Sequence, residues 1–208
     1  MTDFLVMIIK TFELSKKENF NSSIFLLYGV NEGFKNEIIE KYFINNLKVN
    51  VERYEENEIL NNDDFISGLM NKSLFENEKL IIISRLSEKI LKIIELIIEK
   101  KISGVTLILN SKSLDKKSKL RNFFEKDKNL VCIPFYEDDK KTLISLANSY
   151  FRAKKKSISN EAISILIDRC NGDRKNLYNE LNKLTLYLGE RNKINTEDVV
   201  ILTNLSEN

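Results

Sequence analysis

The amino-acid sequence predicts an α/β protein with a parallel five-stranded sheet flanked by helices, followed by a small all-helical domain. In the first part of the chain, short apolar runs alternate with amphipathic helical patterns, as in proteins built from β–α–β units. The chain has a single proline, Pro134, and the alternation stops there. Beyond it, apolar residues recur at helical spacing. We therefore expect an α/β domain over residues 1–137 and a small helical bundle over residues 138–208.

Four strands of the α/β domain are predicted from apolar runs, which cover residues 24–28, 80–84, 105–110 and 130–134. The fifth is placed at residues 49–54, between two predicted helices. The run LIIIS, Leu80 to Ser84, is apolar without alternation, which is typical of a strand covered on both faces of a parallel sheet. A shorter segment, Met7 to Phe12, alternates enough for an edge strand. Helices are expected from about residue 32 and at about 63–70, 87–100 and 116–126.

The helical domain is divided by residues that start or stop helices. Asp138 and Asp139 precede its first apolar stripe, and Ser159 precedes the second, so each is expected to cap a helix N-terminus. Gly172 interrupts the pattern before a third stripe of leucines. A short last helix is predicted at 197–202, after Asn195.

Composition excludes several classes of chemistry. The 208 residues carry a net charge of +2 and no histidine, which rules out histidine-based acid–base catalysis, Ser/Cys–His triads and most zinc sites. Cys132 and Cys170 lie far apart and form no metal-binding pair, and Cys132, within an apolar run, is expected to be a buried thiol. The first six residues lack the basic region of a signal peptide, so none is expected, and no apolar stretch has membrane-spanning length. A cytoplasmic protein is therefore expected.

The segment from Gly29 to Asn36 has the layout of a phosphate-binding loop without its working residues. Aligned on G-x-x-x-x-G-K-[ST], Gly29 matches the first glycine and Lys35 matches the lysine, but Phe34 replaces the second glycine. Asn36 replaces the hydroxyl residue that binds Mg²⁺. Such a loop holds phosphates with backbone N–H groups, so a phenylalanine beside the turn obstructs them. We expect a vestigial loop and no bound nucleotide, with Gly33 as a possible substitute glycine.

Other residues that a working phosphate-binding site requires are also missing. An ATPase needs an acidic residue after a neighbouring strand to hold Mg²⁺, but Arg85 to Ser87 follow the LIIIS strand. Asn110, at the end of the next strand, either orients a phosphate or starts a turn. Arg174 either reaches a nucleotide from the helical domain or is a solvated residue that opens a helix.

Two further features each allow two interpretations. Leu74 and Phe75 are large apolar residues in a polar connection, and they form either part of the core or an exposed plug for a partner's pocket. The basic stretches Lys116 to Lys119 and Lys154 to Lys156 are either solvated helix faces or contacts to phosphate groups.

Four segments together resemble a known family across essentially the whole chain. They are FLLYGVNEGFKNEII, NKSLFENEKLIII, SKLRNFFEK and SNEAISILIDRCNGDRKNLYNELNKL. In order and spacing they resemble the delta subunit of the bacterial DNA polymerase III clamp loader. The resemblance implies an AAA+ type fold that no longer hydrolyses ATP and that binds and opens the ring-shaped sliding clamp during DNA replication. The family's clamp-contacting apolar pair falls on Leu74 and Phe75.

The resemblance also implies partners and a non-enzymatic role. The expected partners are the sliding clamp and the other loader subunits, with DNA contacted weakly or through the complex, and no membrane. No catalytic residue, metal or cofactor is expected, although the holoenzyme that such a subunit serves is a DNA-directed DNA polymerase, a nucleotidyltransferase.

The sequence departs from the family at both ends. The family continues into a helical collar domain, whereas this chain stops at Asn208, so the collar domain is expected to be absent and assembly with other subunits impaired. Met7, rather than Met1, is a second candidate start because the family begins near an MIIK-like strand.

Two alternative functions predict different features. An active AAA+ ATPase with an atypical phosphate loop would lose nucleotide binding in Lys35→Ala. The other inactive loader subunit, or a related replication adaptor, would show a zinc-binding cysteine cluster or a Ser-Arg-Cys motif, and neither is present.

Overall fold

The computed structural model describes residues 22–45, 50–72 and 79–203, without the side chains of residues 71 and 72. The chain divides into two compact units. The first comprises residues up to Val30 together with Lys35–Phe135, and the second comprises Asn31–Phe34 together with the residues from Tyr136 onward. The segment predicted as an edge strand, Met7 to Phe12, lies outside the described residues.

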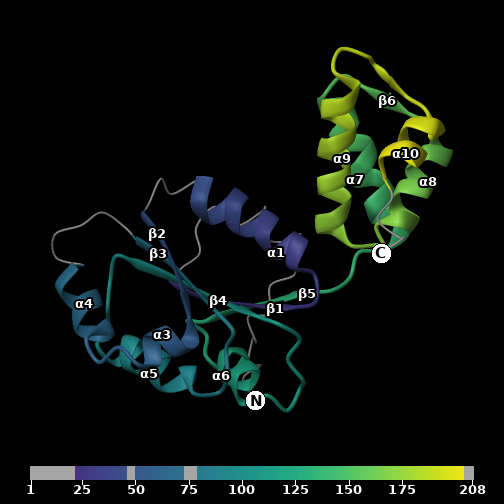
Figure 1. Ribbon diagram of the computed structural model, residues 1–208. Helices are drawn as coiled ribbons and strands as arrows, with labels where there is room; N and C mark the ends of the chain where they lie inside the picture. Colours follow the sequence, from purple (N-terminus) through teal and green to yellow (C-terminus); the bar gives the residue numbers. More distant parts are fainter. Residues whose placement is uncertain (1–21, 46–49, 73–78, 204–208) are drawn as a thin grey trace. The chain divides into compact units, whose positions relative to one another are not determined.

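The first unit is built on a parallel five-stranded sheet (Figure 1). Its strands are β1 (Ile24–Gly29), β2 (Asn50–Glu55), β3 (Lys79–Ser84), β4 (Val105–Ser111) and β5 (Val131–Phe135), in the order β2-β3-β4-β1-β5. Every neighbouring pair runs parallel, and Leu26 of β1 lies opposite Leu109 of β4 and Cys132 of β5. Strands β1, β3 and β5 are buried along almost their whole length, which explains their unbroken apolar runs. The predicted fold class and sheet are confirmed.

Helices cover both faces of this sheet (Figure 1). They are α1 (Glu32–Ile38), its π-helical continuation η2 (Ile39–Ile44), α3 (Glu56–Leu60), α4 (Phe65–Lys72), α5 (Ile90–Glu99) and α6 (Lys119–Lys126). Helices α3 to α6 bury their apolar residues against one face, where Ile94 of α5 and Phe124 of α6 join the core. On the other face, the ring of Phe43 in η2 packs edge-on against Phe25 of β1, with 4.9 Å between the ring centroids.

Helix α3 was missed in the sequence because it lies in an acidic, Asn-rich stretch. A capping box starts it, in which Glu55 and Glu58 exchange hydrogen bonds between side chain and backbone. Its residue Glu56 is buried, and the carboxylate accepts hydrogen bonds from the backbone N–H groups of Ser87 (2.9 Å) and Ile90 (3.0 Å). Glu56 therefore satisfies donors at the start of α5 that would otherwise lack partners.

The second unit contains α7 (Lys140–Ala153), α8 (Asn160–Arg169), α9 (Arg174–Leu188) and α10 (Thr196–Leu202). Asp139, Ser159 and Asp173 each accept a hydrogen bond from the third residue of the helix they precede, as N-cap residues do. Asp138, also expected to cap a helix, instead pairs with Arg174. The unit also holds a short parallel pair, β6 (Ser157–Ile158) and β7 (Lys193–Ile194), which helical periodicity does not predict. No helix in the described part of the chain is long and apolar enough to cross a membrane.

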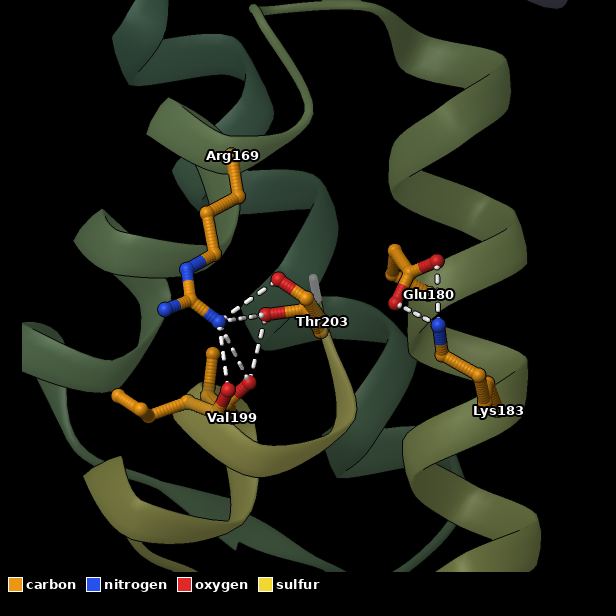
Figure 2. A network of polar contacts seen from close by, with 6 residues as sticks. Arg169, Glu180, Lys183, Val199 and Thr203 are labelled. Carbon is orange, nitrogen blue, oxygen red and sulfur yellow. Dashed lines mark hydrogen bonds and ion pairs between the residues drawn. The ribbon is translucent and has the colours of Figure 1, made fainter. Parts of the chain in front are cut away.

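A half-buried arginine stabilises the last helix of this unit. Figure 2 shows the Arg169 guanidinium, at the end of α8, reaching the carboxyl end of α10. Its Nη1 donates to the carbonyl oxygens of Val199 (3.3 Å), Val200 (2.8 Å) and Thr203 (2.7 Å). A cation at this end also complements the helix dipole. Arg169 therefore caps α10 from a neighbouring helix.

Candidate functional site

Gly29 ends β1, and its place in the sheet accounts for the glycine. Its φ angle is +131°, a conformation that L side chains rarely adopt. A Cβ atom there would lie 2.0 Å from the carbonyl oxygen of Phe135 in the neighbouring strand. Glycine is required by the strand contact itself, so its match to the first position of a phosphate-loop motif needs no ligand to explain it.

Asn31 organises the turn that follows β1. Its side chain is buried, and Oδ1 accepts a hydrogen bond from the backbone N–H of Phe34 at 3.0 Å, which caps the start of α1. Its Nδ2 donates to the carbonyl oxygen of Tyr136 at 3.0 Å and to Oδ2 of Asp138 at 2.8 Å. The turn is therefore hydrogen-bonded to the segment that leads into α7, a role of Asn31 that no local sequence pattern indicates.

Phe34 and Arg174 stack on one another within the second unit. The guanidinium carbon of Arg174 lies 4.0 Å from the centroid of the Phe34 ring, within the range of a cation–π contact. Nη1 of Arg174 pairs with Oδ1 of Asp138 at 2.8 Å, and the side chains of both partners are less than a tenth exposed. Arg174 is therefore not the solvated residue that one reading described. A phosphate would have to compete with Phe34 and Asp138 for its guanidinium.

The open side of Gly33 is filled by the start of α9. A Cβ atom on Gly33 would lie 2.8 Å from the backbone nitrogen of Lys175 and 3.2 Å from Cβ of Arg174. The glycine that sequence reasoning offered as a substitute thus serves close backbone packing. The space beside it is occupied by protein.

Lys35 is directed inward in the first unit. Its side chain is fully buried, and Nζ donates to the carbonyl oxygen of Ser111, the last residue of β4, at 2.6 Å. In a working phosphate loop this lysine reaches the phosphates. Here a charge-assisted hydrogen bond to the backbone holds the ammonium group at the end of the sheet.

A cavity of about 470 Å³ opens at the carboxyl ends of β3 and β4. Its lining residues are Asn36, Ile39, Glu40, Arg53, Ile82, Ser84 and Asn110. Ligands of parallel α/β sheets bind at such strand ends. The single carboxylate of the lining, Glu40, lies 3.9 Å from the Arg53 guanidinium. Ser84 stands where an ATPase needs an acidic residue, and no group of metal-ligating side chains occurs among the described residues.

Asn110 faces this cavity from β4 and does not start a turn. It is the last but one residue of the strand, and its Oδ1 is buried without a hydrogen-bond partner among the described residues. The position is that of a strand-end side chain that meets a ligand, but the residues around it do not supply an Mg²⁺ site. The cavity can therefore hold water or a small polar group, and it is not built for a magnesium–triphosphate.

The two cysteines are structural. Both side chains are buried, and burial raises the pKa of the Cys132 and Cys170 thiols to about 12. At neutral pH both remain protonated and poor nucleophiles. The expectation of a buried Cys132 thiol is confirmed.

Leu74 and Phe75, the predicted clamp-contacting pair, lie outside the described residues. Of the two basic stretches, Lys154 to Lys156 is not part of a helix and follows the end of α7.

Searches for known relatives found likeness in structure alone. No protein-family model matches the chain, and no curated protein matches it. Among solved structures, the DNA clamp loader delta protein of Bacillus subtilis is 19% identical, with a TM-score of 0.54, over 93% of this chain and 61% of that one. RuvB of Thermotoga maritima is 15% identical, with a TM-score of 0.61, over 86% of this chain and 60% of that one.

The fold is AAA+-like. A second RuvB structure, described as a Holliday junction branch migration motor, matches with a TM-score of 0.59 at 14% identity. At these identities the likeness concerns the fold, and the chain spans about three fifths of the length of each of these proteins. The expected resemblance to clamp-loader delta subunits therefore holds at the level of a shared AAA+-like fold.

Proposed function

We propose that this protein is a clamp-loader delta-type subunit, which binds a sliding clamp and favours its open form during DNA replication without hydrolysing ATP. The observation that carries the proposal is the state of the phosphate loop in an AAA+-like fold. Lys35 is committed to the Ser111 carbonyl, and Phe34 is stacked on the Arg174 guanidinium. The groups that would hold phosphates are engaged by the protein's own residues, which fits a subunit that acts through binding.

The proposed mechanism needs only differential affinity. Leu74 and Phe75 supply an apolar plug for a pocket on the clamp, and aromatic and aliphatic anchors of this kind dominate interface energies. If the plug binds the open ring more tightly than the closed ring, the ring equilibrium shifts by that difference in affinity. Hydrolysis of ATP, which resets a loader, then belongs to other subunits. The chain itself is proposed to be a non-catalytic member of a hetero-oligomer.

Binding to the sliding clamp of the same organism tests the proposal. We expect the chain to bind the clamp with micromolar or tighter affinity, measured by calorimetry. We expect Leu74→Ala/Phe75→Ala to weaken binding about thirtyfold or more, because losing a central anchor typically costs at least ~2 kcal/mol. Affinity should be the same with and without ATP.

A matched variant distinguishes the loss of Leu74 and Phe75 from the loss of any two exposed apolar side chains. Tyr136→Ala/Leu186→Ala removes two exposed apolar side chains elsewhere, which are 73% and 82% exposed, and it is expected to bind like the wild type. A folded wild-type chain that fails to bind the clamp would overturn the proposal. So would a Leu74→Ala/Phe75→Ala variant that binds as tightly as the wild type.

A further inference from the structure

We propose that the second unit carries a surface that binds the phosphate backbone of nucleic acid directly. The surface, here called the basic edge, consists of residues 152–156, at the C-terminal end of α7 and in the turn after it, and residues 189–193, before and into β7. The inference goes beyond the proposed function, because clamp binding through Leu74 and Phe75 needs no contact between this chain and nucleic acid.

Backbone and side-chain contacts bring the two segments of the basic edge together. Nζ of Lys156 donates to the carbonyl oxygens of Gly189 and Arg191, each at 2.7 Å. The backbone N–H of Ser157 donates to the Asn192 carbonyl at 2.7 Å, and β6 pairs with β7 directly afterwards. The ammonium group of Lys156 is therefore hydrogen-bonded to backbone carbonyl oxygens. As a result, the turn that contains Lys154 and Lys155 is fixed beside the segment that contains Lys193.

Positive charge is concentrated on this edge. The second unit as a whole is balanced, with twelve basic and twelve acidic residues. The ten residues of the basic edge hold six of those cations and one carboxylate, Glu190. Four of the cations are exposed and form no ion pair with any described residue. They are Arg152, Lys154, Lys155 and Lys193. Four uncompensated cations held by paired segments suit a polyanion with regularly spaced charges.

An exposed aromatic side chain adjoins the basic edge. Tyr187, near the end of α9, is 52% exposed, and the Arg191 guanidinium lies 5.3 Å from its ring centroid. Arg191 also pairs with Asp198 at 3.2 Å, which holds it in place. A tyrosine ring beside cations is the arrangement that stacks on unpaired bases while the cations meet phosphates.

This combination favours nucleic acid over an anionic membrane. Membrane-surface binding is typical of a helix with a basic polar face and a broad apolar face. The basic edge is instead made of the C-terminal end of α7, the turn after it and the segment that leads into β7, so its cations do not line one face of a helix. We therefore assign the basic edge to nucleic acid, with binding independent of sequence and strongly weakened by salt.

The test measures binding of fluorescently labelled single-stranded and duplex DNA to the full chain by anisotropy at low salt. We expect both to bind, with the affinity falling as salt rises. Lys154→Gln/Lys155→Gln/Lys193→Gln is expected to weaken binding at least about tenfold, because three phosphate contacts are lost. Tyr187→Ala is expected to weaken binding of the single strand more than that of the duplex.

A charge-matched variant provides the control. Lys92→Gln/Lys100→Gln/Lys128→Gln removes three exposed cations from the first unit and is expected to change the affinity less than about threefold. Equal weakening by both triple variants, or no binding by the folded wild type at low salt, would overturn the proposal. Tighter binding to phosphatidylglycerol vesicles than to DNA, lost in the first triple variant, would also overturn it. Clamp binding by Lys154→Gln/Lys155→Gln/Lys193→Gln should be unchanged. Either proposal can therefore be overturned without affecting the other.

Discussion

Replacing Arg174 with alanine is expected to lower the free energy of unfolding by about 3–5 kcal/mol, the usual cost of removing one partner from a buried ion pair. The Asp138 carboxylate, 7% exposed, would lose its cation while remaining buried. The Phe34 ring would lose the guanidinium that covers it at 4.0 Å. Urea unfolding followed by far-ultraviolet circular dichroism measures the loss.

Two further variants make this prediction specific. Lys175→Ala changes the next residue, which is exposed, and should stay within about 0.5 kcal/mol of the wild type. Asp138→Ala/Arg174→Ala should be less destabilised than the sum of the two single variants, because no buried charge is left alone. If Arg174→Ala unfolds like the wild type, the ion pair and the stack do not hold the loop as described.

Replacing Lys35 with alanine is expected to destabilise the protein by about 2–4 kcal/mol, even with no nucleotide present. The change removes a fully buried side chain and leaves a cavity. It also leaves the Ser111 carbonyl without the donor at 2.6 Å. In an active phosphate loop the lysine serves the ligand, so the same substitution would chiefly affect nucleotide binding.

Thermal unfolding of three variants separates these contributions. Lys35→Met keeps most of the volume and loses only the donor, so its cost should be about 1–3 kcal/mol. Lys41→Ala, an exposed lysine of η2, should be close to neutral. A Lys35→Ala protein as stable as the wild type would mean that Lys35 has no structural role.

The sheet was predictable because its determinants are local. Buried parallel strands must be apolar on both faces, so a run such as Leu80 to Ser84 is visible in the sequence. The N-caps Asp139 and Ser159 were visible for the same reason, since each acts within one helical turn. Helix α3 could not be predicted, because its acidic, Asn-rich sequence has no apolar stripe to indicate a helix.

The candidate site was predictable only in part. The motif located Gly29 and Lys35, and the replacement of glycine by Phe34 indicated a lost function. What fills the loop was not predictable, because Asp138 and Arg174 come from segments more than a hundred residues away along the chain. No local pattern links such residues, and a buried ion pair looks in a sequence like two surface charges.

Titration of the wild-type chain with magnesium–ATP by calorimetry tests most directly the claim that this AAA+-like protein works without nucleotide. We expect no binding at physiological nucleotide concentrations, because Lys35 is held by the Ser111 carbonyl and Arg174 is held by Phe34 and Asp138. Stoichiometric binding that is abolished in a folded Lys35→Met variant would contradict it. That result would identify the chain as an ATP-binding member of the same fold.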